Sequence, residues 1–118
     1  LTRGSGREQI VTATLQSVAY QTRDLIDAMA EDGIRPSVIR VDGGMVANDW
    51  FLQFLADVLQ IPVERPHNVE STVLGAAYLA AYRSGLVKSM QDVERLWQRD
   101  RLFEFRRVFS GRIALCRL

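Results

Sequence analysis

The chain has 118 residues, of which 47% are hydrophobic and 25% are charged, and its formal net charge is +1. This balance is typical of one globular domain, and it argues against a disordered chain and a general nucleic-acid binder. The longest nearly uncharged run, residues 71–82, is shorter than the roughly 20 residues that a membrane-spanning helix needs, so we expect no membrane span. The single cysteine, Cys116, excludes an internal disulfide, so the expected compartment is a reducing cytoplasm.

Residues 8–31 are predicted to form a long amphipathic helix, because apolar side chains recur there at three- and four-residue steps. The members of this stripe are Val11, Leu15, Val18, Leu25 and Met29. Asp32 and Gly33 are expected to end the helix. The run "GSGREQ" at residues 4–9 begins like a dinucleotide-binding motif, but Gln9 stands where the third glycine belongs. We interpret this run as a loop that leads into the helix.

Residues 37–41 follow Pro36, are rich in β-branched side chains and are predicted to form a strand. A second helix is predicted from about residue 48 to residue 59, with Phe51, Leu55 and Val58 on one face. The piece "IPVERP" at residues 61–66 is bounded by prolines and is predicted to be extended, but too brief for a central strand.

A third helix is predicted over residues 71–84, capped by Ser71 or Thr72 and ended by Gly85. Its expected buried stripe consists of Leu74, Ala77, Tyr78 and Ala81. The small residues 75–77 are interpreted as a surface for close packing.

A fourth helix is predicted over residues 89–98, and no sustained periodicity follows Leu102. Only residues 37–41 therefore qualify as a convincing strand. Because a short apolar strand in an α/β sheet needs several neighbours, we expect a larger fold whose other strands precede residue 1.

Residues 95–118 carry seven arginines against Asp100 and Glu104, an excess of five positive charges, so the rest of the chain is net acidic by four. We interpret this stretch as a solvated terminal segment. Binding of phosphate or nucleic acid is the alternative, although no aromatic and basic pattern of a nucleic-acid module accompanies it.

Two adjacent glycines, Gly43 and Gly44, lie between the predicted strand and the second helix. Backbone without a Cβ permits a positive φ angle or the close approach of a ligand, and the helix start adds free N–H groups beside it. The pattern suits a nucleotide, with a plain tight turn as the alternative. Asn48 either contacts a base or ribose or caps the helix, and Asp42 either binds a ligand or ends the strand. His67 has no cluster of ligand residues near it in sequence and is interpreted as a surface residue, so no metal ligand is predicted.

Residues 40–80 closely resemble the carboxyl-terminal domain of glycerol kinases, which belong to the FGGY carbohydrate kinase family, and residues 1–29 are similar to the segment that precedes it. The specific features are D-G-G-x-V-A-N and then A-D-x-L-x-x-P-V-x-R-P. Sister kinases for pentoses and gluconate tend to have G-G-G-A-K-S in place of D-G-G-M-V-A-N, and this difference favours glycerol as the substrate. The resemblance covers about residues 1–104, a partial kinase domain, and residues 105–118 form an atypical basic tail.

The resemblance implies an α/β fold, the carboxyl-terminal part of an actin-like, ribonuclease H-like ATPase domain that is rich in helices with few strands. It implies that Gly44 and Asn48 contact ATP or ADP and that Gly43 shapes the turn. The complete kinase would use Mg²⁺ and ATP to convert glycerol to glycerol 3-phosphate. The glycerol-binding groups, catalytic aspartate and phosphate loops of the family precede residue 1. We therefore expect no catalytic residue in this chain and no activity from the chain alone.

Two alternatives stay open. One is a kinase of the same family for another polyol or sugar, since the residues that select the substrate lie upstream. The other is a non-catalytic interaction module that binds an acidic partner through the basic tail. For a fragment of a kinase we expect an exposed apolar face where the rest of the enzyme would lie, and self-association into a homo-oligomer.

Overall fold

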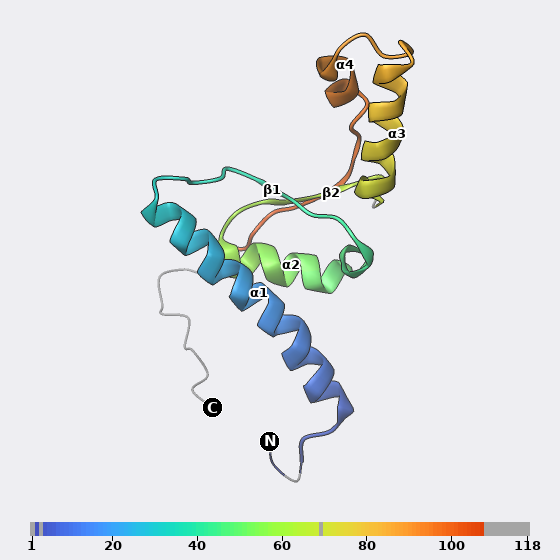
Figure 1. Cartoon of the computed structure of the whole chain (residues 1–118). Helices are drawn as coiled ribbons and strands as arrows, with labels where there is room; N and C mark the ends of the chain where they lie inside the picture. The colour runs from blue at the N-terminus through green and yellow to red at the C-terminus, as the bar shows by residue number, and fades with distance from the viewer. Residues whose placement is uncertain (1, 3, 69, 108–118) are drawn as a thin grey trace.

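The structure, a computed structural model, describes residues 2, 4–68 and 70–107 (Figure 1). Its elements in chain order are α1 (Arg7–Glu31), β1 (Ile39–Arg40), the 3₁₀ helix η1 (Gly44–Ala47), α2 (Asp49–Leu59), β2 (Val63–Pro66), α3 (Ser71–Arg83), α4 (Met90–Arg95) and β3 (Arg99–Phe103). None of the helices in these described stretches has the length and apolar character that crossing a membrane requires. Cys116 and most of the predicted basic tail lie outside the described residues.

The strands form one three-stranded sheet in the order β1-β2-β3, and β2 is its middle strand. β1 is parallel to β2, with Ile39 opposite Val63, whereas β3 is antiparallel to β2, with Phe103 opposite the same valine. Val63 is completely buried. The sheet is therefore centred on a strand of only four residues, β2.

A strand lies within the predicted residues 37–41, but β1 covers only two of them. Residues 61–66 are extended, as predicted, but the prediction that they are too brief for a central strand was wrong, because β2 is the middle strand. β3 was not predicted. β3 has the sequence RDRLF, in which charged side chains on an exposed edge hide any apolar alternation. Pairing along both edges of β2 stabilises a strand that is too short to be recognised from its own residues.

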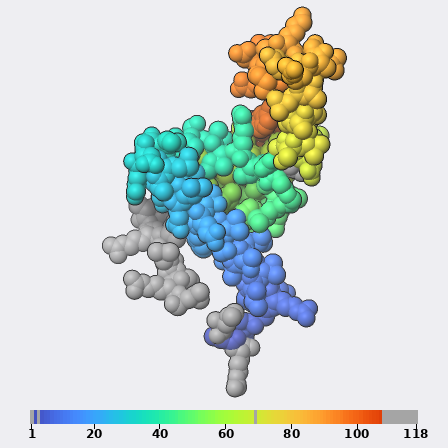
Figure 2. Space-filling view, in the orientation of Figure 1, coloured from blue at the N-terminus to red at the C-terminus, as the bar shows by residue number. Residues whose placement is uncertain are grey.

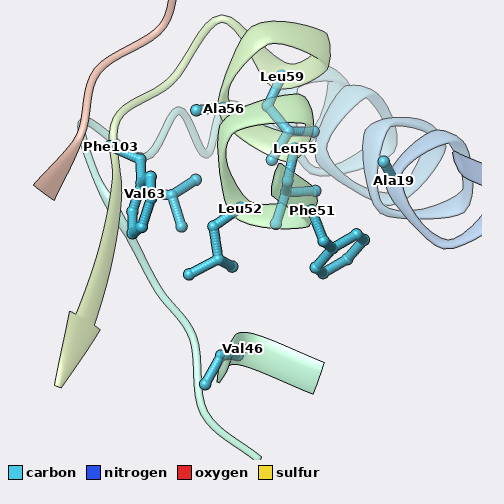
Figure 3. Packing of buried hydrophobic residues seen from close by; sticks show 9 residues of the cluster. All are labelled: Ala19, Val46, Phe51, Leu52, Leu55, Ala56, Leu59, Val63 and Phe103. Carbon is cyan, nitrogen blue, oxygen red and sulfur yellow. The ribbon is translucent and has the colours of Figure 1, made fainter. Parts of the chain in front are cut away.

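The core lies between α2, the sheet and the middle of α1 (Figure 3). Its buried members are Ala19, Val46, Phe51, Leu52, Leu55, Ala56, Leu59, Val63 and Phe103. Five of these come from α2, so the predicted apolar face of this helix is confirmed.

The predicted stripe of α1 is correct only in part. Leu15 and Val18 pack against the core, but Val11 and Leu25 are each 60% exposed. Figure 1 shows α1 running past α2, so only the middle of α1 meets it. Ala19, which is fully buried, is small enough to let the two helices approach.

α3 and α4 project away from this core (Figures 1 and 2) and have no buried residues. In the predicted stripe of α3, Leu74, Tyr78 and Ala81 are half-buried and Ala77 is exposed. The predicted caps were also wrong, because Glu70 is the N-cap residue and its side chain accepts no capping hydrogen bond. α4 ends at Arg95, short of the predicted residue 98. Gly85 follows α3 with φ +78°, which confirms its predicted role in ending the helix.

Candidate functional site

The glycine pair forms the turn between β1 and α2. Gly43 has φ +92° and ψ 175°, a conformation that is essentially limited to glycine. Gly44 begins η1 and does not have a positive φ, and a Cβ placed on it meets no described atom within 4 Å. The backbone therefore requires glycine at position 43. At position 44, neither the backbone conformation nor a described neighbour accounts for the missing side chain.

Asn48 is the N-cap residue of α2. Its Oδ1 accepts a hydrogen bond from the main-chain N–H of Phe51 at 3.1 Å, so the capping interpretation is confirmed. Its own main-chain N–H donates to the carbonyl oxygen of Met45 at 3.2 Å. The residue is exposed, and its Nδ2 has no hydrogen-bond partner among the described residues. Capping thus leaves the amide nitrogen available to another molecule.

η1 is held to the core by one side chain. Val46 is 3% exposed and lies at the edge of the cluster in Figure 3. Its main-chain N–H donates to the carbonyl oxygen of Gly43 at 3.2 Å. Both glycines are exposed. The turn is therefore anchored on its inner side, and its outer side is open.

Arg65 of β2 binds the inner side of this turn. Its Nη1 donates to the carbonyl oxygen of Val46 at 3.0 Å and to Asp49 Oδ1 at 2.7 Å. Its Nε donates to Asp100 Oδ2 at 2.8 Å. The hydrogen bonds to the two carboxylates raise the pKa of Arg65 above its ordinary value. The sequence analysis missed this residue, because its partners lie 16 to 35 positions away and no local pattern indicates them.

The other candidate residues are not brought together with the turn into one cluster. Asp42 is exposed after the end of β1, and His67 is exposed, as predicted. The described stretches contain no group of three or more His, Cys, Asp or Glu side chains that could hold a metal ion. At the start of α1, Gln9 Oε1 accepts a hydrogen bond from the main-chain N–H of Gly6 at 2.9 Å. Gln9 therefore caps the helix, which supports the interpretation of residues 4–9 as a helix-leading loop.

A hollow of about 400 Å³ lies elsewhere, between the end of β2, α3 and the segment before β3. Its lining includes Pro66, Leu74, Tyr78 and Trp97 but neither the glycine pair nor Asn48. The turn thus lies on an open surface of this chain.

Four arginines of the basic segment have acidic partners in the described part of the chain. Their ion pairs are Arg95 with Asp92, Arg99 with Glu64, Arg101 with Asp49 and Arg106 with Asp57. Carboxylates within the protein therefore offset much of the local charge excess. This observation weakens the interpretation of the segment as a binding site for an acidic partner.

Comparison with known proteins identifies a family that the chain resembles. The sequence model of the FGGY family of carbohydrate kinases, C-terminal domain, matches residues 1–84. A protein named glycerol kinase from Rhodospirillum centenum is 52% identical over 115 residues, which are 98% of this chain and 23% of that protein.

Two solved structures have the same fold. The crystal structure of Plasmodium falciparum glycerol kinase with ADP is 34% identical, with a TM-score of 0.74 over 90% of this chain and 22% of that one. The ligand-bound xylulose kinase from Lactobacillus acidophilus superposes with a TM-score of 0.73 at 21% identity, over the same shares of the two chains. The chain thus spans between a fifth and a quarter of the length of these proteins.

Proposed function

The chain belongs to the FGGY family of carbohydrate kinases, and from this membership we propose that it forms the adenosine side of the nucleotide site in a glycerol kinase. The complete kinase would transfer the γ-phosphoryl group of ATP to a hydroxyl group of glycerol, which gives glycerol 3-phosphate. The fold is α/β, the carboxyl-terminal part of an actin-like ATPase domain, rich in helices and with a small sheet. We further propose that residues 1–104 are the kinase domain portion and that residues 105–118 are a tail outside it.

The observation that carries the proposal is Gly44. Its backbone conformation is open to other residues, and a Cβ would meet open space. A glycine that the fold itself does not require is accounted for if another molecule approaches the backbone there. The turn follows a strand of the parallel pair, which is where α/β sheets commonly bind ligands.

Two further features suit a nucleotide at this turn. The start of α2 presents main-chain N–H groups and the positive end of the helix dipole, which favour an anionic or polar ligand. The Nδ2 of Asn48 is placed beside the same turn and supplies a donor for a ribose or base. We therefore assign Gly44 and Asn48 to contact with ATP or ADP, and Gly43 to the shape of the turn.

The chemical groups of phosphoryl transfer are not assigned to this chain. In this reaction Mg²⁺ ions neutralise the developing charge on the phosphates. The described residues contain no group of three or more His, Cys, Asp or Glu side chains that could hold a metal ion, and we assign no ligand of Mg²⁺ to this chain. The contribution of this chain is thus to bind and orient the adenosine part of the nucleotide, which places the reacting phosphate for the rest of the enzyme.

Glycerol is the proposed substrate because the similar protein from Rhodospirillum centenum carries that name at 52% identity. The xylulose kinase shares the fold at 21% identity, so the fold alone does not select glycerol over another polyol or sugar. Activity of the complete kinase with glycerol, xylulose and gluconate as separate acceptors distinguishes these substrates. A preference for xylulose or gluconate would overturn the assignment of glycerol.

Substitution of Gly44 by alanine in the complete kinase tests the nucleotide assignment. Because the new methyl group meets no described atom of this chain within 4 Å, we expect unchanged folding and an unchanged KM for glycerol. The KM for ATP should rise by on the order of tenfold, as the nucleotide is displaced from the turn.

Gly43→Ala is the matched control. At φ +92° this alanine is strained by about 1–3 kcal/mol, so we expect a lower melting temperature whether or not nucleotide binds. Both KM values and the melting temperature are measured for each variant. An unchanged KM for ATP in a well-folded Gly44→Ala enzyme would remove the proposed site.

A further inference from the structure

Arg65 joins the segment that holds the proposed nucleotide contacts to the sheet. Val46, whose carbonyl oxygen accepts from Arg65 Nη1 at 3.0 Å, lies between Gly44 and Asn48 in sequence. Asp49, whose Oδ1 accepts from the same nitrogen at 2.7 Å, is the first residue of α2 and follows Asn48 directly. One guanidinium group thus binds both η1 and the first residue of α2.

The remaining contacts of the Arg65 guanidinium group are with β3, the neighbouring strand of the sheet. Its Nε donates to Asp100 of β3 at 2.8 Å, and its centre lies 5.5 Å from the ring centroid of Phe103. The Arg65 side chain is 15% exposed, whereas Asp49 and Asp100 are 50% and 40% exposed, so the guanidinium is largely shielded from water but its two carboxylate partners are not. Asp49 also forms an ion pair with Arg101 of β3, so a second arginine of the sheet contacts the first residue of α2.

From these contacts we infer that Arg65 is a positioning residue for the nucleotide. It sets the separation between Gly44 and Asn48 by holding η1 and the first turn of α2 against β2, without touching the nucleotide itself. This inference rests on the proposed function, because it presumes that those two residues contact ATP.

The inference depends on the planar fork of arginine. Three donor–acceptor contacts leave the guanidinium in different directions, to a main-chain carbonyl and to two carboxylates. A lysine keeps the charge, but its three N–H donors all leave one nitrogen, whereas arginine donates to these acceptors from two separate nitrogens, Nε and Nη1, so a lysine does not reproduce all three contacts. Arg65→Lys should therefore loosen the turn while leaving the net charge unchanged.

Arg23 provides a matched control in the same chain. Its Nη1 donates to the carbonyl oxygen of Val58 at 2.7 Å, and its Nε binds Asp27. It therefore makes the same kinds of contact as Arg65, but at the opposite end of α2. A purely structural effect on α2 should lower the melting temperature in both arginine variants without raising the KM for ATP.

The experiment compares Arg65→Lys, Arg23→Lys and Gly44→Ala in the complete kinase by both KM values, kcat and melting temperature. We expect Arg65→Lys to raise the KM for ATP by on the order of tenfold, with the KM for glycerol changed less than about twofold. Arg23→Lys should lower the melting temperature with both KM values intact. Asp49→Asn, which weakens one of the three contacts of Arg65 and also the ion pair of Asp49 with Arg101, serves if Arg65→Lys does not fold, and it should raise the KM for ATP about two- to fivefold.

Two results would overturn the inference, and they are distinguishable. If Gly44→Ala raises the KM for ATP but folded Arg65→Lys and Asp49→Asn do not, the positioning role fails and the proposed function stands. If none of the three changes the KM for ATP, the nucleotide site itself is elsewhere, and the role of Arg65 fails with it.

Discussion

Asn48 illustrates how one residue serves the fold and the proposed site at once. Its Oδ1 caps α2 through the N–H of Phe51, while its Nδ2 has no partner among the described residues. An N-cap contributes about 1 kcal/mol to stability whether or not a nucleotide binds. The two roles are therefore separable, because they use different atoms of the same amide.

Substitutions at position 48 distinguish these roles in the complete kinase. Asn48→Ser retains an oxygen that can cap the helix but loses the amide donor, so the KM for ATP should rise about two- to tenfold with little change in melting temperature. Asn48→Ala loses both groups, so we expect a similar rise in KM and also a lower melting temperature. If neither variant changes the KM for ATP while alanine still lowers the melting temperature, Asn48 is a cap and nothing more.

Among the elements, the short strands depend on one carboxylate. Glu64 of the middle strand binds Arg40 of β1 and Arg99 of β3, at 3.1 and 3.0 Å. Burial of this carboxyl group raises its pKa, but the hydrogen bonds and charges of the two arginines outweigh that effect, so its pKa is lowered overall. One side chain therefore ties both edge strands to β2.

The lowered pKa of Glu64 predicts a stability loss in acid. A carboxylate whose pKa is lower in the folded state stabilises that state above its unfolded pKa of about 4.3 and loses this contribution as pH falls through the folded pKa. We expect Glu64→Gln to have a lower melting temperature than the parent at pH 6, with the difference shrinking below about pH 4. Glu104→Gln, at an exposed position, is the control and should follow the parent throughout. A constant difference between parent and Glu64→Gln from pH 6 to pH 3 would contradict the ion-pair account.

At the scale of the whole molecule, the chain exposes much apolar surface. Leu86 is 82% exposed, Val73 67% and Leu79 57%, all in or just after α3. The radius of gyration is 18.0 Å, larger than the about 13.5 Å of a compact domain of this length. Apolar faces of this kind drive association when they extend over a few hundred Å².

We therefore predict that the purified 118-residue chain forms dimers or larger species and has no glycerol kinase activity. Light scattering over a range of concentrations measures the first, and a coupled assay with Mg-ATP and glycerol measures the second. Leu79→Glu combined with Leu86→Glu should shift the chain toward monomer, whereas Glu31→Gln, far from α3 in sequence, should not. A freely soluble monomer at every concentration would contradict the predicted self-association. Turnover above background would contradict the predicted lack of activity.

The sequence by itself determined the features that depend on neighbouring residues. The periodicity of residues 8–31 and 48–59 predicted α1 and α2 nearly to their ends, and Gly85 was correctly placed after α3. The position of Gly43 and Gly44 between a strand and a helix was also correct. These features follow from local conformational preferences and from contacts within one or two turns of the chain.

Only the tertiary structure decided what distant residues do to one another. β2 became the middle of a sheet because strands from both sides of it in sequence pair with it, and β3 was recognisable only in that pairing. Leu15 and Val18 are the members of the predicted α1 stripe that pack against the core, and this choice depends on where α2 crosses α1. Arg65 was not found from sequence because its carboxylates come from α2 and β3, and hydrogen bonds between residues so far apart leave no periodic trace in the chain.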